Sequence, residues 1–126
     1  MSKFQFVETK DAAQPLGHYS QAVIHNGIVY VATQLGIVPN QPIVVGSIEE
    51  QTKAALNNVQ AILHAAGSDL NKVLKVTIYL SDIQLWDQVN AVYLQFFRTH
   101  KPARGVIPSG LFHKGFQVAI DVIAAV

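Results

Sequence analysis

Cysteine is absent from this 126-residue chain, and charged residues make up only 13% of it. The lack of cysteine excludes disulfides, thiolate metal sites and a cysteine nucleophile. No apolar run reaches the roughly 18 to 20 residues of a membrane-spanning helix, because Lys75, Asp82 and Asp121 interrupt the best ones. We therefore expect no membrane association. The opening MSKFQFVETK also lacks the apolar segment of a secretory signal, so the cytoplasm is the expected location.

Motifs for metals, cofactors and nucleic acids are missing as well. The five histidines show no i, i+4 pairing and no nearby carboxylate pattern, so we expect no metal. The sequence has neither a Gly-x-Ser-x-Gly elbow around a serine nor a glycine-rich phosphate loop. The net charge is +1 and the basic residues are scattered, which leaves no stripe to bind nucleic-acid phosphates.

Apolar residues are abundant for a chain with so little charge. They make up 50% of the sequence, and the mean hydropathy is +0.26. A chain of 126 residues is close to the commonest domain size, so we expect residues 1–126 to form a single domain. Because monomers rarely expose large apolar patches, the apolar excess predicts burial between identical subunits.

The first half of the sequence predicts a hairpin followed by a helix. Two β-rich runs, Tyr19–Ile24 and Ile28–Thr33, flank an Asn-Gly pair at positions 26 and 27, which favours a tight turn. Ser47 and Glu50 fit a capping box at a helix start, and Gly67 is placed to end that helix. The polar face of the helix is expected to carry Lys53, Asn57, Asn58 and Gln60.

The second half predicts strand, helix and strand. Val73–Leu80 is largely β-branched or aromatic, and Asp82 precedes a helix expected to run to about Thr99. A strand should follow Pro102, and Phe116–Val126 fits a central strand covered on both faces. The buried side of the second helix is expected to carry Trp86, Val89, Tyr93, Phe96 and Phe97.

This order of elements predicts an α/β (α+β) fold. Two helices would pack on one face of a mixed β-sheet. The opposite face of the sheet, with its alanine, valine and isoleucine residues, is then the candidate surface for contacts between subunits.

Arg104 is the clearest candidate for ligand binding. In residues 101–105 (KPARG), a prolyl turn delivers the arginine to the start of the expected strand. A planar guanidinium binds a carboxylate through two parallel hydrogen bonds, a geometry that lysine cannot offer. Taken alone, such a motif is more often an ordinary surface or ion-pairing arginine.

Asp121 and Tyr19 are further candidates, each with a structural alternative. Asp121 lies among apolar residues, so it must be paired, hydrogen-bonded or neutral. It fits a general acid/base acting on water or an imine nitrogen, and it fits a structural acid equally well. Tyr19 fits a pocket wall, and it also fits a tyrosine packed at a strand start with its hydroxyl in water.

Seven short segments share their order and spacing with one known family over nearly the whole chain. They are residues 17–22 (GHYSQA), 46–52 (GSIEEQT), 56–59 (LNNV), 65–68 (AAGS), 76–80 (VTIYL), 89–93 (VNAVY) and 100–104 (HKPAR). With these segments the chain resembles the YjgF/Rid family of enamine/imine deaminases, also called the endoribonuclease L-PSP family.

The resemblance implies a chorismate-mutase-like fold and a homotrimer with three clefts between its subunits. It also implies hydrolysis of 2-imino or 2-enamino acids, of the 2-iminopropanoate and 2-iminobutanoate type, to 2-oxo acids and ammonia without a cofactor. By resemblance, Arg104 holds the substrate carboxylate, Tyr19 lines the cleft and Asp121 positions water. The remaining residues expected to bind substrate are Ala32, Thr33, Gln34, Gly105 and Val106.

Several positions depart from the common pattern of the family. Active members usually read Ser-Gly-Gln where this chain has Ala-Thr-Gln at 32–34, and Thr33 adds bulk near the expected ligand. Gly105 and Val106 replace a small residue and a cysteine, which removes polar groups from the cleft floor. Asp121 replaces the usual glutamate and is one methylene shorter, which can lose a direct contact but still allow one through water.

The leading functional hypothesis is a deaminase acting on a carboxylate-bearing imine or enamine. The alternative is a trimeric binding protein that uses Arg104 to hold a 2-oxo acid or similar metabolite without turnover and so regulates a partner. Thr33 and Asp121 keep this alternative open. Ribonuclease activity, attached to parts of the family, is disfavoured by the near-neutral charge.

Overall fold

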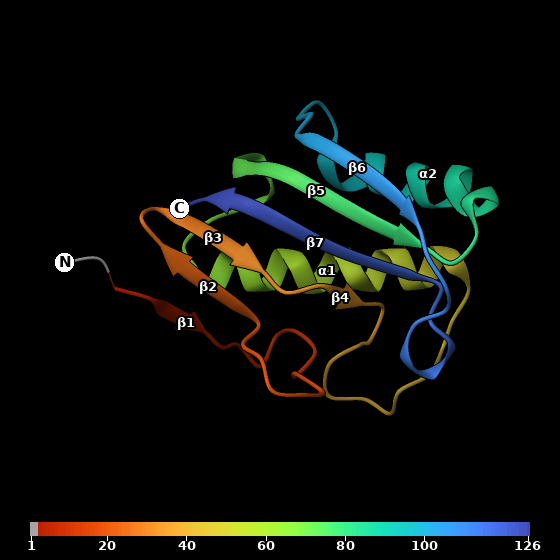
Figure 1. Cartoon of the computed structure of the whole chain (residues 1–126), viewed down its shortest axis with the longest axis horizontal. Helices are drawn as coiled ribbons and strands as arrows, with labels where there is room; N and C mark the ends of the chain where they lie inside the picture. Colours follow the sequence, from red (N-terminus) through yellow and green to blue (C-terminus); the bar gives the residue numbers. More distant parts are fainter. Residues whose placement is uncertain (1–2) are drawn as a thin grey trace.

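The structure, a computed structural model, describes residues 3–126 as a mixed sheet with two α-helices (Figure 1). The strands are β1 (Gln5–Val7), β2 (Ala22–His25), β3 (Ile28–Val31), β4 (Gln34–Leu35), β5 (Val73–Leu80), β6 (Ala103–Pro108) and β7 (Val118–Ala125). The helices are α1 (Ile48–Ala65) and α2 (Trp86–Phe97), with short 3-10 turns at Leu70–Lys72, Ile83–Leu85 and His113–Gly115.

Strand β7 lies at the centre of the sheet, as the sequence predicts. The strand order is β1-β2-β3-β7-β5-β6, and the short β4 also pairs with β7. The pairing of β5 with β6 is parallel, whereas the other pairings are antiparallel. A parallel pair needs a crossover, and α2 provides it.

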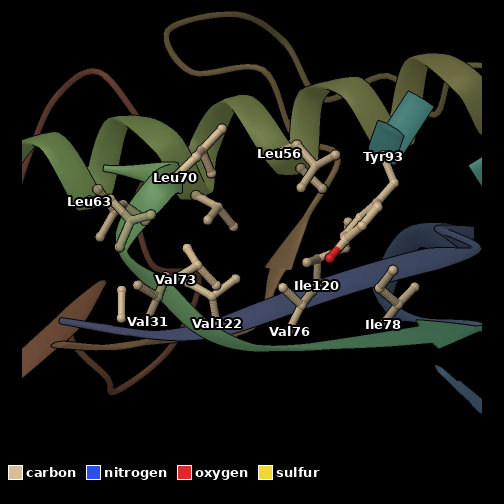
Figure 2. Close-up of a cluster of buried hydrophobic side chains, with 14 of the residues drawn as sticks. Val31, Leu56, Leu63, Leu70, Val73, Val76, Ile78, Tyr93, Ile120 and Val122 are labelled. Atoms are coloured by element: carbon tan, nitrogen blue, oxygen red, sulfur yellow. The ribbon is translucent and has the colours of Figure 1, made fainter. Parts of the chain in front are cut away.

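Both helices lie on the same side of the sheet (Figure 1), which confirms the predicted fold class. Figure 2 shows Leu56 and Leu63 of α1 directed toward Val76, Ile120 and Val122 of the sheet. All five side chains are buried, with no more than 1% of their surface exposed. The hydrophobic core of residues 3–126 therefore lies between the helices and one face of the sheet.

The local signals at the hairpin and at α1 are confirmed. Asn26 and Gly27 have φ angles of 52° and 77°, as the tight turn between β2 and β3 requires. The Glu50 backbone N–H donates to Ser47 Oγ at 3.1 Å, and the Ser47 N–H donates to Glu50 Oε1 at 2.9 Å. Gly67 follows the helix with a φ of +80°, so the predicted helix has the expected start and end.

Two side chains assigned to helix faces lie elsewhere. Asn58, expected on the polar face of α1, is 1% exposed because the loops before and after the hairpin cover that part of the helix. Trp86, expected in the core, is 39% exposed because it is the first residue of α2 and lies at the edge of the sheet.

Two element starts differ from the expectation, and two strands were not expected at all. The second helix starts at Trp86, because Asp82 caps a separate 3-10 turn by accepting a hydrogen bond from the Gln84 N–H at 2.9 Å. The last strand starts at Val118 rather than Phe116. Strands β1 and β4 were not predicted, since three and two residues are too few for a periodic pattern.

One face of the sheet has no helix over it. Along β7, Val118, Ile120, Val122 and Ala124 belong to the core, whereas Asp121, on the other face, is only half-buried. Within one chain, therefore, β7 is not covered on both faces as the sequence predicts. The open face also carries exposed aromatic rings: Phe6 and Tyr30 are 70% and 48% exposed. Among residues 3–126, no helix is both long and apolar enough to cross a membrane.

Candidate functional site

Arg104 occupies an aromatic setting where β6 meets α2. Its guanidinium carbon lies 4.6 Å from the centroid of the Tyr93 ring and 5.1 Å from that of Trp86. Its Nη1 donates a hydrogen bond of 2.9 Å to Asn90 Oδ1. Rings and amide together fix the plane of the guanidinium, so its orientation is set before a ligand arrives.

The sequence of α2 explains this arrangement. Residues 86, 90 and 93 are spaced four and three positions apart, which places their side chains on one face of the helix. After the helix, Arg98 adopts a φ of 55° and turns the chain back. A ring nitrogen of His100 lies 2.8 Å from the Val73 carbonyl oxygen and fixes the start of the return to β6. Arg104 therefore lies beside the face of α2 that carries residues 86, 90 and 93.

The site around Arg104 is suited to an anion. A guanidinium has five N–H donors, and the bond to Asn90 uses one of them. Burial raises the pKa of the Tyr93 hydroxyl, while the charge of Arg104 and its hydrogen bonding with the phenol partly lower it. Tyr93 therefore remains a neutral neighbour that does not cancel the positive charge.

Arg104 lines two cavities, and the first is too small for a metabolite. It is lined by Arg104, Trp86 and Val106, among others, and its volume is about 10 Å³. One water molecule needs roughly that much space. The second cavity, of about 230 Å³ and lined by Asn90, Tyr93 and Arg104 among others, has room for a small carboxylate ligand.

Asp121 belongs to a second group of polar side chains, on the open face of the sheet. Thr33 Oγ1 donates a hydrogen bond of 2.8 Å to Asp121 Oδ2. The pKa of Tyr79 is raised, first by burial and then by the negative charge of Asp121 and its hydrogen bonding with the phenol. The carboxylate thus lies between hydroxyl groups from two different segments of the chain.

Tyr19 and Gln34 lie near this second group. With Thr33, they line a cavity of about 90 Å³ below the loop that precedes β2. The Leu16 backbone N–H donates to the Tyr19 hydroxyl oxygen at 3.2 Å, and half of the tyrosine surface is exposed. Gln34 is buried and donates to the Ala32 carbonyl oxygen at 3.0 Å, so it shapes the backbone of this loop.

Arg104 and Asp121, the two residues expected to act together, lie on opposite faces of the sheet. Val76 is paired with Arg104 and with Val122, whereas Thr77 is paired with Gly105 and with Asp121. Paired residues of adjacent strands point to the same face. Since Val76 is a core residue, Arg104 lies on the helix side and Asp121 on the open side.

The expected substrate-binding residues divide between the same two groups. Val106 lies beside Arg104 and lines its cavity. Gly105 points to the open face, next to Thr77, and a Cβ placed on it would meet nothing within 4 Å. Thr33 contacts Asp121, and Tyr19 and Gln34 line a cavity with Thr33, although Gln34 is paired with the core residue Ile120 and is buried on the helix side. A single chain therefore holds two half-sites: an arginine half-site on the helix side and an acid half-site on the open side.

Three positioning residues were missed from the sequence. Asn90, which contacts Arg104, was detectable only from its helical spacing to Trp86 and Tyr93. Gln21 is 2% exposed and binds backbone groups of Thr9 and Ala13, and Asn58 holds the loops beneath the acid half-site. A polar residue within an apolar stretch of sequence does not indicate which distant groups its side chain will contact. Within the described part of the chain, histidine, aspartate and glutamate side chains form no cluster suited to a metal ion.

Comparison with known proteins gives consistent similarities. Residues 9–126 match the family described as Endoribonuclease L-PSP. The 2-iminobutanoate/2-iminopropanoate deaminase of Bos taurus is 39% identical over 121 residues, which cover 95% of this chain and 88% of that protein. A RutC family protein of Pyrococcus horikoshii is also 39% identical, with 95% and 96% covered. The solved structure of YyfA from Yersinia pestis, of the Rid family, has a TM-score of 0.94 and 38% identity, with 98% and 100% covered.

Proposed function

The chain belongs to the YjgF/Rid family, also called the endoribonuclease L-PSP family, and on that premise we propose that it is an enamine/imine deaminase. Its substrates are 2-imino and 2-enamino acids of the 2-iminopropanoate and 2-iminobutanoate type. Its products are the 2-oxo acid and ammonia. The observation that carries the proposal is the Arg104 guanidinium, which is oriented by Asn90 and two aromatic rings and has donors left for a carboxylate.

In this proposal, Arg104 binds the substrate and Asp121 handles the proton. The substrate carboxylate pairs with the guanidinium, which holds the imine carbon in a fixed place. Water adds to that carbon, the C=N electron pair moves to nitrogen, and the carboxylate of Asp121 accepts the proton of the water. Asp121 returns that proton to the nitrogen, which gives a neutral carbinolamine. The hydroxyl proton of the carbinolamine is then relayed by the same carboxylate to the nitrogen, the C–N bond breaks as the C=O bond forms, and ammonia leaves the 2-oxo acid. An enamine substrate first takes up a proton on carbon to become the imine.

The site requires two copies of the chain. Since Arg104 and Asp121 lie on opposite faces of one sheet, a cleft that contains both must join the arginine half-site of one subunit to the acid half-site of the next. Such a contact joins two different surfaces and repeats until a ring closes. A ring of three gives the homotrimer and the three clefts that the family resemblance implies.

The direct test is release of ammonia and 2-oxo acid from freshly generated 2-iminopropanoate and 2-iminobutanoate. We expect acceleration by the protein, and a loss of kcat/KM of about a hundredfold or more in Arg104→Ala, because the substrate is no longer held in place. Lys72→Ala removes an exposed cation outside both cavities that Arg104 lines, and it should leave the rate unchanged.

The same assay distinguishes the alternative. If the protein releases no ammonia above the rate without protein, deaminase function is contradicted. The trimeric binding protein then becomes the leading function. That function would be supported if the wild-type protein binds 2-oxobutanoate and the Arg104→Ala variant does not.

A further inference from the structure

The acid half-site contains a contact that strand pairing itself sets up. Strand β4 pairs with β7 so that Gln34 lies opposite Ile120. The antiparallel register then brings the preceding residue, Thr33, next to Asp121. Their side chains lie on the open face and are joined by the 2.8 Å hydrogen bond from Thr33 Oγ1 to Asp121 Oδ2. Residues 88 positions apart in sequence therefore meet through backbone geometry.

A second hydroxyl-bearing side chain lies near the same carboxylate, on the other side of β7. On β5, Thr77 lies opposite Asp121 and Tyr79 lies opposite Ala119, so Tyr79 is the diagonal neighbour of Asp121 on the open face. The Tyr79 ring is itself held by an edge contact with Phe112, with ring centroids 6.5 Å apart. The hydroxyls of Thr33 and Tyr79 thus flank Asp121.

A neutral hydrogen-bond donor affects a carboxylate differently from the way a cation does. A hydroxyl occupies one lone pair and fixes the rotation of the group, but it leaves the negative charge in place. The other lone pairs of the carboxylate remain free to accept a proton from water. Aspartate needs such support because its carboxylate must face the cleft at one angle for proton transfer to be efficient.

We propose that Thr33 is a positioning residue for Asp121, with Tyr79 as a second support on the opposite side. Thr33 holds the carboxylate in the orientation that accepts the proton of the attacking water. The inference rests on the proposed deaminase function for its kinetic consequence, but the contact itself is testable without substrate.

The kinetic test uses variants that separate the hydroxyl from the shape of the side chain. Thr33→Val keeps the shape and removes the donor, whereas Thr33→Ser keeps the donor. We expect kcat to fall about tenfold in Thr33→Val, the range for loss of a hydrogen bond to a charged group, with KM unchanged. Thr33→Ser should recover most of that loss. Tyr79→Phe should lower kcat in the same manner.

Thr77 provides the matched control. It also lies on the open face, opposite Asp121 in the register, yet among residues 3–126 no hydrogen bond joins the two side chains. Thr77→Val should therefore keep the wild-type kcat. Equal kcat values for Thr33→Val and Thr77→Val would overturn the inference, as would a Thr33→Ser variant as impaired as Thr33→Val.

A double-mutant cycle separates this inference from the proposed function. Urea unfolding is measured for Thr33→Val, Asp121→Ala and the double variant, and again with Thr77→Val in place of Thr33→Val. Alanine is used at position 121 because it has no acceptor for the Thr33 hydroxyl. We expect the effects of Thr33→Val and Asp121→Ala to be non-additive and those of Thr77→Val and Asp121→Ala to add. Additive effects at Thr33 overturn the inference whatever the activity. An inactive wild type with coupled effects contradicts the deaminase and supports the positioning of Asp121 by Thr33.

Discussion

Arg104 shows how neighbouring side chains turn a common residue into a specific one. A free arginine on a surface samples many rotamers, and ordering it on binding costs free energy. Here the rings of Trp86 and Tyr93 and the amide of Asn90 restrict the guanidinium before a ligand arrives. The remaining exposed edge can accept a planar carboxylate in one orientation.

Trp86 should report ligand binding at Arg104 directly. It is the only tryptophan in the chain, and its ring lies 5.1 Å from the guanidinium carbon. We expect a saturable change in tryptophan fluorescence when 2-oxobutanoate is added, because the ligand changes the charge next to the ring. Arg104→Ala should abolish the change, and Lys72→Ala, outside both cavities that Arg104 lines, should retain it. A response that survives in Arg104→Ala would place the ligand elsewhere.

The sequence predicted the candidate residues better than their partners. The prolyl turn before Arg104 indicated a strand start, and the structure has Arg104 as the second residue of β6. Trp86 was assigned to the core because an aromatic residue at helical spacing usually packs there. In the sequence, Thr33 and Asp121 are two separate departures from the family pattern. In the structure, a hydrogen bond joins their side chains. Contacts of this kind depend on strand register, which no local pattern encodes.

At the scale of elements, buried polar side chains hold the loops near the acid half-site. The Asn58 amide accepts from the Ala13 N–H at 3.1 Å and donates to the carbonyl oxygens of Leu35 and Ile37 at 3.3 and 2.8 Å. One side chain of α1 therefore connects the segment before β2 to the segment after β4. The loop that contains Thr33 lies between these anchors.

Replacing Asn58 should destabilise the fold more than replacing its neighbour. Asn58→Ala leaves one buried and two partly buried backbone hydrogen bonds unmade, and we expect a loss of roughly 2 to 4 kcal/mol in the free energy of unfolding. Asn57→Ala, at an exposed position of the same helix, should change it by no more than about 0.5 kcal/mol. Urea unfolding of both variants checks the prediction, and equal effects would contradict it.

The start of α1 should make stability depend on pH. Hydrogen bonds with the backbone and side chain of Ser47 lower the pKa of Glu50 from its ordinary value of 4.5. A group with a lowered pKa in the folded state stabilises the protein above its unfolded pKa, and this contribution is lost as the pH falls through the folded pKa. The loss should therefore begin near pH 4.5 and be complete below the lowered value.

Two matched variants test this pH dependence. Thermal unfolding of wild type and Glu50→Gln is compared from neutral pH to well below pH 4.5. The difference between them should shrink as the pH falls, because the wild-type carboxylate loses its charge. Glu49→Gln, at the adjacent exposed position, should track the wild type. A Glu50→Gln curve parallel to wild type at every pH would contradict the prediction.

Long elements with clear end signals were predicted well, and short ones were not. The capping box and Gly67 defined α1, and the β-branched run defined β5 with the bounds that the structure has, Val73–Leu80. Strands β1 and β4 form because partners elsewhere in the chain are available to pair with them. Their two or three residues have no independent preference that a sequence window detects.

At the scale of the whole molecule, the open face accounts for the unusual composition. Helices cover one side of the sheet, while Phe6, Tyr30 and Ile107 remain 70%, 48% and 46% exposed. A second copy of the chain on this face would bury these side chains and bring an arginine half-site to Asp121. Composition predicted self-association, but the separation of the two half-sites required knowledge of the sheet register.

The central claim is that each active cleft combines Arg104 of one subunit with Asp121 of another, and mixing two inactive variants tests it most directly. Arg104→Ala and Asp121→Asn are purified separately, unfolded together and refolded so that their subunits mix at random. In a ring, about a quarter of the clefts then receive both intact residues, so deaminase activity should return to about a quarter of wild type. A mixture that stays inactive, although mass measurement shows mixed oligomers, would contradict the shared cleft.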